Sequence, residues 1–358
     1  MSMKSGSIEF RSWFRGCSGS DVFHSDGMSG MVLVTGASGF VGGAVCRALC
    51  EKGYSVRGTG RRERPAGLAD DVEYLAGDLC DTAFVQKLCE GVQVVVHAAA
   101  KAGVWGPEED YLRANVEATE ILLQSARESG VVAFVLTSTP SVVFDGKPIQ
   151  GGDERMPYGE SFPCAYPATK AVAERMVLAA NKDDFRTLAL RPHLIWGPGD
   201  NHLFPRVFDR ADAGKLRMVG EGTNRVDLTY IDNVAAGHVA AVESLLAGKG
   251  GGAAYFLTQD EPVELWPWVN RVLAGTGRQE IRRKVPLKAA YFAGVVCELL
   301  WKITQRSSEP PMTRFVAQEM AKDHWFSSRA AREVLGYRPL VTMEDGLKTY
   351  LEALRNGD

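Results

Sequence analysis

A glycine-rich segment directly after an apolar run most constrains the fold of this chain. The run Met-Val-Leu-Val at positions 31–34 leads into Thr-Gly-Ala-Ser-Gly-Phe-Val-Gly at positions 35–42, and a helix-like stretch follows. At a strand-to-helix junction, Gly36 permits a tight turn, Gly39 lets backbone N–H groups approach a pyrophosphate, and Gly42 lets the helix pack closely on the strand. The alternative is a purely structural turn. The pattern predicts a dinucleotide-binding loop with the ligand-contacting residues Gly36, Ser38, Gly39, Phe40, Val41 and Gly42.

The rest of the first half alternates short apolar runs with helix-like stretches. The runs at residues 92–100, 133–138 and 185–192 are rich in Val, Leu and Ala and do not alternate with polar residues. Strands that are buried on both faces have this composition, and the spacing leaves room for crossover helices. The pattern predicts an α/β fold built on a doubly wound parallel sheet of the Rossmann type.

The alternation of apolar runs and helix-like stretches ends at about Pro192, and Gly and Pro follow at residues 197–199. This change predicts a second lobe. The first residues are polar and rich in Gly and Ser, and they lack the apolar run of a signal peptide. The expected organisation is a flexible N-terminal extension over residues 1–30, a Rossmann domain over 31–192 with later strands returning near 226–258, and a smaller α/β substrate lobe over most of 193–358.

Composition excludes several classes of protein. With 45% hydrophobic and 24% charged residues, the chain has the composition of a globular protein rather than a disordered one. Forty-one Lys and Arg against 44 Asp and Glu give a net charge of −3, so no basic excess points to nucleic acid. The seven cysteines form no C-x-x-C pair, which argues against a zinc site or a disulfide framework. We therefore expect no metal, and a cytoplasmic protein with free thiols.

Arginines follow the second expected strand, where an enzyme that binds NAD normally offers a carboxylate to the ribose 2′-hydroxyl. The chain reads Val-Arg-Gly-Thr-Gly-Arg-Arg at residues 56–62 and has no Asp or Glu there. Arg61 suits a 2′-phosphate, so NADP(H) is favoured over NAD(H), unless Arg61 and Arg62 are simply solvated loop charges. Asp78 and Leu79 follow the third strand. Asp78 is expected to contact the edge of the cofactor's adenine ring, and the alternative is a purely structural role in a turn.

Tyr166 and Lys170 form the second motif that indicates the function of this chain. Their four-residue spacing places them on the same side of a helix, and Pro167 is tolerated in its first turn. A phenol becomes an acid–base group near neutral pH only when a nearby ammonium stabilises the phenolate, which Lys170 would supply. At the end of the strand over residues 133–137, Thr139, or else Ser138, is expected to hydrogen-bond a substrate carbonyl, unless these hydroxyls only cap the strand.

The segment at residues 289–303 is apolar except for Glu298 and Lys302. Its 15 residues are too few to span a bilayer. The segment is interpreted as a buried or substrate-lining helix, or as a surface that touches a membrane or an apolar partner.

In its order of motifs the chain resembles the extended short-chain dehydrogenase/reductases, and within them the 3β-hydroxysteroid dehydrogenase group. The resemblance rests on the glycine loop, His97-Ala98-Ala99-Ala100, Asn115, Ser138-Thr139, Tyr166 with Lys170, and the motifs at residues 190–192, 195–200 and 230–234. It implies an NAD(P)-dependent oxidoreductase with Thr139, Tyr166 and Lys170 as the catalytic residues. Threonine stands where many members have serine. It also implies that Ala98 and Ala99 contact the cofactor and that Pro192 and Ile195 line the nicotinamide face.

The amino-acid sequence at residues 101–106, 137–142 and 309–315 is most similar to that of bacterial 2-alkyl-3-oxoalkanoate reductases of long-chain olefin synthesis. That resemblance implies reduction of the 3-oxo group of a long-chain lipid. Sterol-4α-carboxylate 3-dehydrogenases are close rivals, so a steroid-like substrate is the alternative. Nucleotide-sugar epimerases or dehydratases, with Arg206, Arg210 and Arg225 holding a diphosphate, and a non-enzymatic NADPH-binding sensor are further alternatives. Relatives imply a homodimer through the helices at residues 108–129 and 167–181, and peripheral contact with a membrane or another pathway enzyme is considered.

Overall fold

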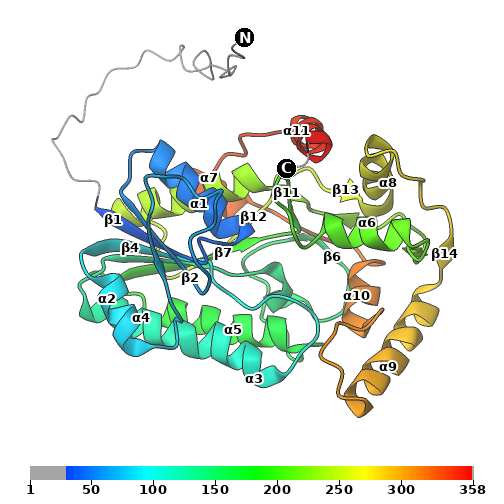
Figure 1. Cartoon of the computed structure of the whole chain (residues 1–358), viewed down its shortest axis with the longest axis horizontal. Helices are drawn as coiled ribbons and strands as arrows, with labels where there is room; N and C mark the ends of the chain where they lie inside the picture. Colours follow the sequence, from blue (N-terminus) through cyan, green and yellow to red (C-terminus); the bar gives the residue numbers. More distant parts are fainter. Residues whose placement is uncertain (1–29, 357–358) are drawn as a thin grey trace, which may run out of the picture.

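The computed structural model describes residues 30–356. Its centre is a parallel sheet of seven strands in the order β12-β7-β5-β4-β1-β2-β3 (Figure 1). The predicted extension over residues 1–30 lies, except for Gly30, outside the described residues. The strands are β1 (Met31–Thr35), β2 (Val56–Gly60), β3 (Glu73–Ala76), β4 (Val92–His97), β5 (Ala133–Thr137), β7 (Arg186–Pro192) and β12 (Ala254–Leu257).

Helices cover both faces of this sheet, as Figure 1 shows. One face carries α1 (Phe40–Glu51) and α7 (Ile231–Leu246), and the other carries α2 (Thr82–Cys89), α4 (Ala118–Glu128) and α5 (Ala165–Ala179). Along β1, Val32 and Val34 pack in the core under α1, whereas Leu33 packs in the core on the opposite side. Because both faces are buried, the strands need no polar residues in alternation, which explains the continuous apolar runs of the sequence.

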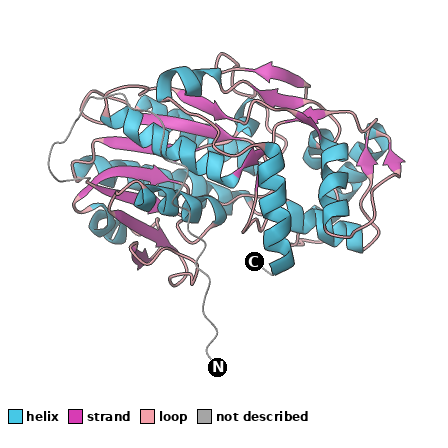
Figure 2. Cartoon of the chain, turned by 90° about the horizontal axis from the view of Figure 1, so that it is seen from above, coloured by secondary structure: helices cyan, strands magenta, loops and turns pink. Residues whose placement is uncertain are grey.

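The second lobe is assembled from segments that are far apart in the chain. Figure 2 shows its helices and short strands to one side of the main sheet. Its four-stranded sheet has the order β13-β10-β15-β6, and short two-stranded pairs β11-β8 and β14-β9 flank it. The strands are β6 (Ile149–Gly152), β8 (Ile195–Trp196), β9 (Met218–Val219), β10 (Arg225–Val226), β11 (Thr229–Tyr230), β13 (Val263–Glu264), β14 (Lys284–Val285) and β15 (His324–Phe326). The helices are α6 (Phe204–Asp212), α8 (Leu265–Gly275), α9 (Leu287–Ile303), α10 (Arg314–Glu319) and α11 (Met343–Asn356).

An aromatic cluster joins the two lobes around Trp196, whose ring is fully buried. Its ring packs edge-on against Phe204 of α6, Tyr230 of β11, Trp268 of α8 and Tyr350 of α11. The same core cluster continues to β1 and α1 of the first lobe. The lobes therefore share one apolar core.

Candidate active site

A cavity of about 940 Å³ runs along the carboxyl ends of the parallel strands, and we call it the main cavity. Ligands of doubly wound sheets bind at this edge. The structure brings every predicted site residue except Lys170 to its wall. These residues are Gly36, Ser38, Gly39, Phe40, Val41, Gly42, Arg61, Asp78, Leu79, Ala98, Ala99, Thr139, Tyr166, Pro192 and Ile195.

The glycine loop is shaped by close contacts that leave no room for side chains. Gly36 has a φ of +70°, and a Cβ there would lie 2.8 Å from the Ala99 nitrogen. A Cβ on Gly42 would lie 2.2 Å from the Gly36 carbonyl oxygen, so only glycine lets α1 start this close to β1. Gly39 is the N-cap residue of α1 and offers no capping side chain. The first N–H groups of α1 therefore remain open for an anion such as a pyrophosphate.

The wall at the end of β2 carries two arginines, Arg61 and Arg62, which are both exposed. Within the described residues neither guanidinium makes a hydrogen bond or an ion pair. The nearby carboxylate in the wall, Asp78, is engaged: it accepts hydrogen bonds from the Cys80 backbone N–H at 3.0 Å and from Arg113 at 2.8 Å. These two contacts hold the pKa of Asp78 below its ordinary value. This end of the cavity therefore offers free cations to a ligand.

His97, at the end of β4, fixes the loop that carries Ala98 and Ala99. The Thr119 hydroxyl donates its proton to the Asn115 carbonyl and therefore accepts a hydrogen bond from His97 Nε2 at 3.0 Å. With its proton on Nε2, the His97 ring accepts at Nδ1 from the Thr35 hydroxyl at 2.7 Å. The Thr35 oxygen in turn accepts the Ala99 N–H. Burial lowers the pKa of His97 to about 3, so the ring stays neutral and this hydrogen-bond chain persists at physiological pH.

Tyr166 and Thr139 meet in the wall of the main cavity. Thr139 precedes the short 3₁₀ helix Pro140–Val143 and caps it, because its Oγ1 accepts from the Ser141 N–H. Burial raises the pKa of Tyr166 to about 12, and the Thr139 hydroxyl, which is hydrogen-bonded to the phenol, acts in the opposite direction. The phenol is protonated at neutral pH, the form that gives a proton to a reduced carbonyl oxygen.

Lys170 lies one turn after Tyr166 on α5 and is buried. Its Nζ donates to the Thr137 carbonyl at 2.7 Å, at the end of β5. Of the groups around the phenol, the Thr139 hydroxyl acts to lower the pKa of Tyr166. The contribution expected of Lys170 stays a prediction. Burial lowers the pKa of Lys170 itself to about 8, and the Glu174 carboxylate opposes this shift.

Glu174 is the residue of this site that the sequence analysis missed. It is fully buried one turn beyond Lys170 and accepts hydrogen bonds from Ser138 Oγ, from Tyr158 at 2.8 Å and from Nε and Nη2 on one edge of the Arg191 guanidinium. The carboxylate thus ties α5 to the end of β5 and to β7. Its four-residue spacing from Lys170 was the signal available in the sequence, since it predicts the same helical face.

Asn115 provides a second tie between α5 and the cavity wall. It lies in a π-helical turn over Leu112–Glu117, between α3 (Glu108–Tyr111) and α4. Its amide accepts the Lys101 N–H at 2.7 Å and donates to Thr169 Oγ1 at 3.0 Å. Single π turns occur often at functional sites. Here the turn fixes the loop at Lys101 relative to the helix that carries Tyr166.

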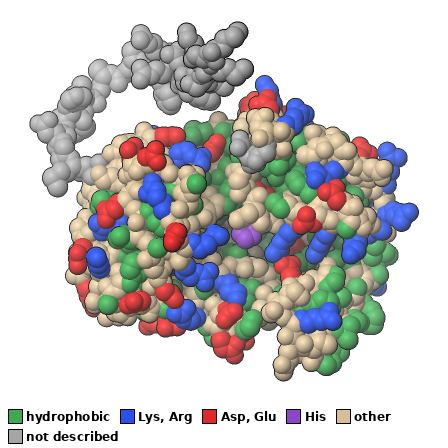
Figure 3. Space-filling view, in the orientation of Figure 1, with side chains coloured by type: hydrophobic (Ala, Val, Ile, Leu, Met, Phe, Trp, Pro, Cys, Tyr) green, Lys and Arg blue, Asp and Glu red, His purple; other side chains and the backbone are tan. Residues whose placement is uncertain are grey.

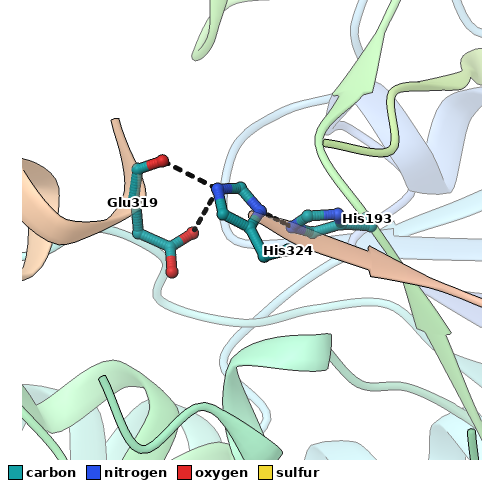
Figure 4. A group of neighbouring side chains, drawn as sticks. All are labelled: His193, Glu319 and His324. Carbon is teal, nitrogen blue, oxygen red and sulfur yellow. Dashed lines mark hydrogen bonds and ion pairs between the residues drawn. The ribbon is translucent and has the colours of Figure 1, made fainter. Parts of the chain in front are cut away.

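The chain leaves β7 through a strained corner at the nicotinamide end of the predicted site. Leu194, in the cavity wall, has a φ of +36°, which is rare for a residue with a side chain. The preceding His193 is held by His324 of β15, and His324 by Glu319 of α10 (Figure 4). The corner is therefore attached to the second lobe.

The group His193, Glu319 and His324 contains ligand atoms within 4.8 Å of one another, the spacing of a metal site. The Glu319 backbone carbonyl can only accept, so His324 Nε2 carries a proton, and His324 Nδ1 accepts from His193 Nε2 at 3.2 Å. A metal ligand nitrogen must be free of a proton. Because both ring nitrogens of His324 are used in hydrogen bonds, we interpret the group as a structural link.

The chain is similar to known proteins over most of its length. The family model described as the 3-beta hydroxysteroid dehydrogenase/isomerase family matches residues 33–287. A 2-alkyl-3-oxoalkanoate reductase of Stenotrophomonas maltophilia is 44% identical over 88% of this chain and 97% of its own length. The mouse sterol-4-alpha-carboxylate 3-dehydrogenase (decarboxylating) is 34% identical over 90% of each chain.

Solved structures confirm the predicted Rossmann fold. The crystal structure of gox2253 is 28% identical with a TM-score of 0.74, and the alignment covers 91% of this chain and 98% of that one. MoeE5 in complex with UDP-glucose and NAD is 25% identical with a TM-score of 0.70, over 92% and 99%. From the family match and these relatives, the chain belongs to the 3-beta hydroxysteroid dehydrogenase/isomerase family and is an oxidoreductase that acts on CH–OH or C=O groups.

Proposed function

We propose that this protein uses NADPH to reduce the 3-oxo group of a 2-alkyl-3-oxoalkanoate to the 3-hydroxy acid, as a step of long-chain olefin synthesis. The observation that carries the proposal is the meeting of a protonated Tyr166 and Thr139 in the main cavity, in a chain 44% identical to a 2-alkyl-3-oxoalkanoate reductase. The glycine cradle, the open N-terminus of α1 and the unpaired arginines fit a phosphorylated dinucleotide. When bound, that cofactor supplies the hydride.

The residues of this chain would then orient the substrate, donate the proton and stabilise the charge that develops. Thr139 donates a hydrogen bond to the 3-oxo oxygen and orients the carbonyl. As C3 gains the hydride, its oxygen takes the Tyr166 proton, so the ketone becomes a secondary alcohol and the tyrosine a phenolate that water reprotonates. Lys170 supplies positive charge behind the tyrosine, and Pro192 and Ile195 form the apolar wall of the nicotinamide face.

The test of this proposal is NADPH oxidation at 340 nm by the purified protein with a synthetic 2-alkyl-3-oxo long-chain acid. A 4α-carboxysterol with NAD+ or NADP+ is the parallel assay, because the mouse sterol dehydrogenase is 34% identical. Turnover of the keto acid supports the reductase. Reduction of the cofactor by the sterol with release of carbon dioxide, and no turnover of the keto acid, would make a decarboxylating sterol dehydrogenase the better assignment.

A nucleotide sugar is a weaker candidate, although MoeE5 binds UDP-glucose and NAD. The arginines considered for a diphosphate are partly engaged. Arg206 is ion-paired with Glu309 at 2.8 Å, and Arg225 donates to the Pro262 carbonyl at 2.8 Å. These contacts would have to break before either guanidinium bound a diphosphate.

We also propose that the protein works as a cytoplasmic homodimer paired through the helical segment at residues 108–129 and through α5. The exposed apolar side chains Leu112, in the π turn before α4, and Val172, on α5, support this arrangement, since each is 44% exposed. The pair would bury both side chains against their copies.

Arg61 and Arg62 give the cofactor proposal its own prediction. Replacing both with Ala should raise the Kd for NADPH by about 10- to 100-fold, because charge-assisted hydrogen bonds to the 2′-phosphate are lost. The Kd for NADH should stay within about threefold of wild type, because NADH lacks that phosphate. Titration of protein fluorescence measures both values. Arg155→Ala is the control, since Arg155 pairs with Asp153 away from the cavity. Equal losses for the two cofactors would contradict the assignment.

The lowered pKa of Lys170 predicts the pH dependence of reduction. The ammonium is the useful form, and it is lost as pH rises through the pKa of about 8. We therefore expect kcat/KM for the ketone to be constant below that pH and to fall about tenfold per pH unit well above it. In Lys170→Arg, whose guanidinium stays charged, this fall should disappear even if the rate is lower. An unchanged profile in Lys170→Arg would show that another group titrates.

A further inference from the structure

Helix α9 stands at the outer edge of the second lobe (Figure 1) and packs on α10 through one narrow face. The buried residues of that face are Ala290, Gly294 and Glu298, spaced by four. A Cβ on Gly294 would lie 2.7 Å from the Arg314 nitrogen, so glycine permits the close approach. Glu298 accepts from the backbone N–H and the Nε of Arg314 at 2.7 and 2.8 Å. The attachment of α9 thus uses its small residues and its only carboxylate.

The opposite face of α9 is apolar and exposed. Phe292 is 68%, Leu299 57% and Ile303 69% exposed, and the spacing of these residues puts them on one side of the helix. Figure 3 shows hydrophobic side chains gathered over this part of the molecule. Single exposed apolar residues are ordinary, but a continuous stripe marks an interaction surface. Besides these three, the exposed large apolar residues of α9 are Tyr291, Val295, Val296 and Leu300.

The segment that carries this stripe is rich in basic side chains, of which Arg282 is ion-paired with Glu280 just outside it. Residues 281–308 contain six basic side chains and one carboxylate, that of Glu298, which is buried. Lys288 and Lys302 are exposed near the two ends of the helix. The chain as a whole carries a net charge of −3, so the cations are concentrated here against the overall balance. The surface therefore combines exposed apolar side chains with a positive border.

A second cavity of about 610 Å³, which we call the side cavity, lies behind α9. Trp301, Lys302 and Arg306 line it on the α9 side. On the other side its wall is formed by Ala165 and Ala168 of α5, which flank Tyr166 in the sequence. Helix α9 thus separates an exposed apolar surface from a cavity beside the catalytic helix.

We propose that the exposed face of α9 binds the surface of an anionic lipid bilayer, with the side cavity as the way in for a lipid substrate. Such helices lie in the interface with their apolar side chains among the acyl chains and their cations at the headgroups. No helix in residues 30–356 is long and apolar enough to cross a membrane. The entry role rests on the proposed function, whereas the binding itself does not.

The positive border decides between a bilayer and a second copy of this chain. Two copies paired through α9 would bring the same basic side chains together, and like charges repel. Anionic headgroups neutralise these charges and leave the stripe in apolar surroundings. The charge therefore favours the lipid surface.

The experiment is cosedimentation of the full chain with vesicles of phosphatidylcholine, alone or with about one-third phosphatidylglycerol. Wild type should bind the anionic vesicles at least about tenfold more tightly than the neutral ones, and the difference should shrink as salt is raised. The double substitution Phe292→Asp with Leu299→Asp should lower the bound fraction about tenfold or more, because two charges would enter the apolar layer. The matched control is Leu340→Asp, whose side chain is 72% exposed outside α9 and whose variant should bind like wild type.

The folding of the double variant is checked by its Tm and its Kd for NADPH, both of which should match wild type. Vesicle binding that survives the double substitution, or wild type that ignores anionic vesicles, overturns the proposal. Self-association of wild type that the double variant loses would also overturn it, because a second copy would then cover the face. Failure to reduce the keto acid, with vesicle binding intact, would count against the proposed function and the entry role but not against the surface.

Discussion

Replacing Tyr166 with Phe should lower kcat for the ketone by about 10²- to 10⁴-fold, the range that a positioned general acid contributes. The phenol is the group that gives the proton, and its pKa of about 12 keeps it protonated at neutral pH. Phenylalanine keeps the ring and removes only the hydroxyl. The Kd for NADPH should therefore stay within about threefold of wild type. Steady-state turnover and fluorescence titration measure the two quantities.

The control for this variant is Tyr255→Phe. Tyr255 lies on β12 and its hydroxyl donates to the Gly250 carbonyl at 3.0 Å, away from the main cavity. Its loss should leave kcat near the wild-type value. If Tyr166→Phe keeps more than a few per cent of wild-type turnover, the proton comes from another group, and Thr139 is the next residue to test.

Replacing Glu174 with Ala should lower the free energy of unfolding by about 3–5 kcal/mol, because it leaves the Arg191 guanidinium buried without its partner. Arg191 is 3% exposed and Glu174 is fully buried, so water cannot replace the carboxylate. Ser138 and Tyr158 would lose the same acceptor. A fall in Tm of roughly 10 °C is expected for a chain of this size, and urea unfolding measures the free energy.

The chain offers a matched control in Glu344, which makes two hydrogen bonds to Arg271 on the surface, at 2.8 and 2.6 Å. Glu344→Ala should cost about 1 kcal/mol or less, because exposed ion pairs contribute little. The double variant Glu174→Leu with Arg191→Met removes both buried charges and should recover part of the loss. If Glu174→Ala and Glu344→Ala had equal effects, the buried network would not stabilise the fold as we infer.

The Rossmann half of the fold could be predicted because its information is local. Each strand is an apolar run buried on both faces, and the glycine loop marks the first strand-to-helix junction. Thr139 follows β5 and Tyr166 lies in the first turn of α5, and both line the main cavity at the edge where ligands of such sheets bind. Their catalytic roles stay predictions. The side of the main cavity that the first lobe forms therefore followed from the sequence.

The second lobe could not be predicted in the same way. Its sheet pairs β6 with β15 across almost half of the chain, and its strands of two to four residues are too short to show a period. The exposure of α9 could not be predicted either, because a buried apolar helix and an exposed apolar helix have the same pattern of residues in the sequence. Its direction is set by Gly294 packing against the backbone at Thr313 and Arg314.

The position of β12 at the end of the sheet has a consequence for synthesis. Strand β7 ends at Pro192, but β12, which pairs with its open edge, begins only at Ala254. While the ribosome makes the intervening residues, β7 exposes unpaired backbone groups on a strand whose sides are apolar, the kind of edge that recruits other chains. The cofactor-binding half is thus not an independent folding unit that ends where its motifs end. A fragment cut after the last recognisable motif would carry an open, aggregation-prone edge.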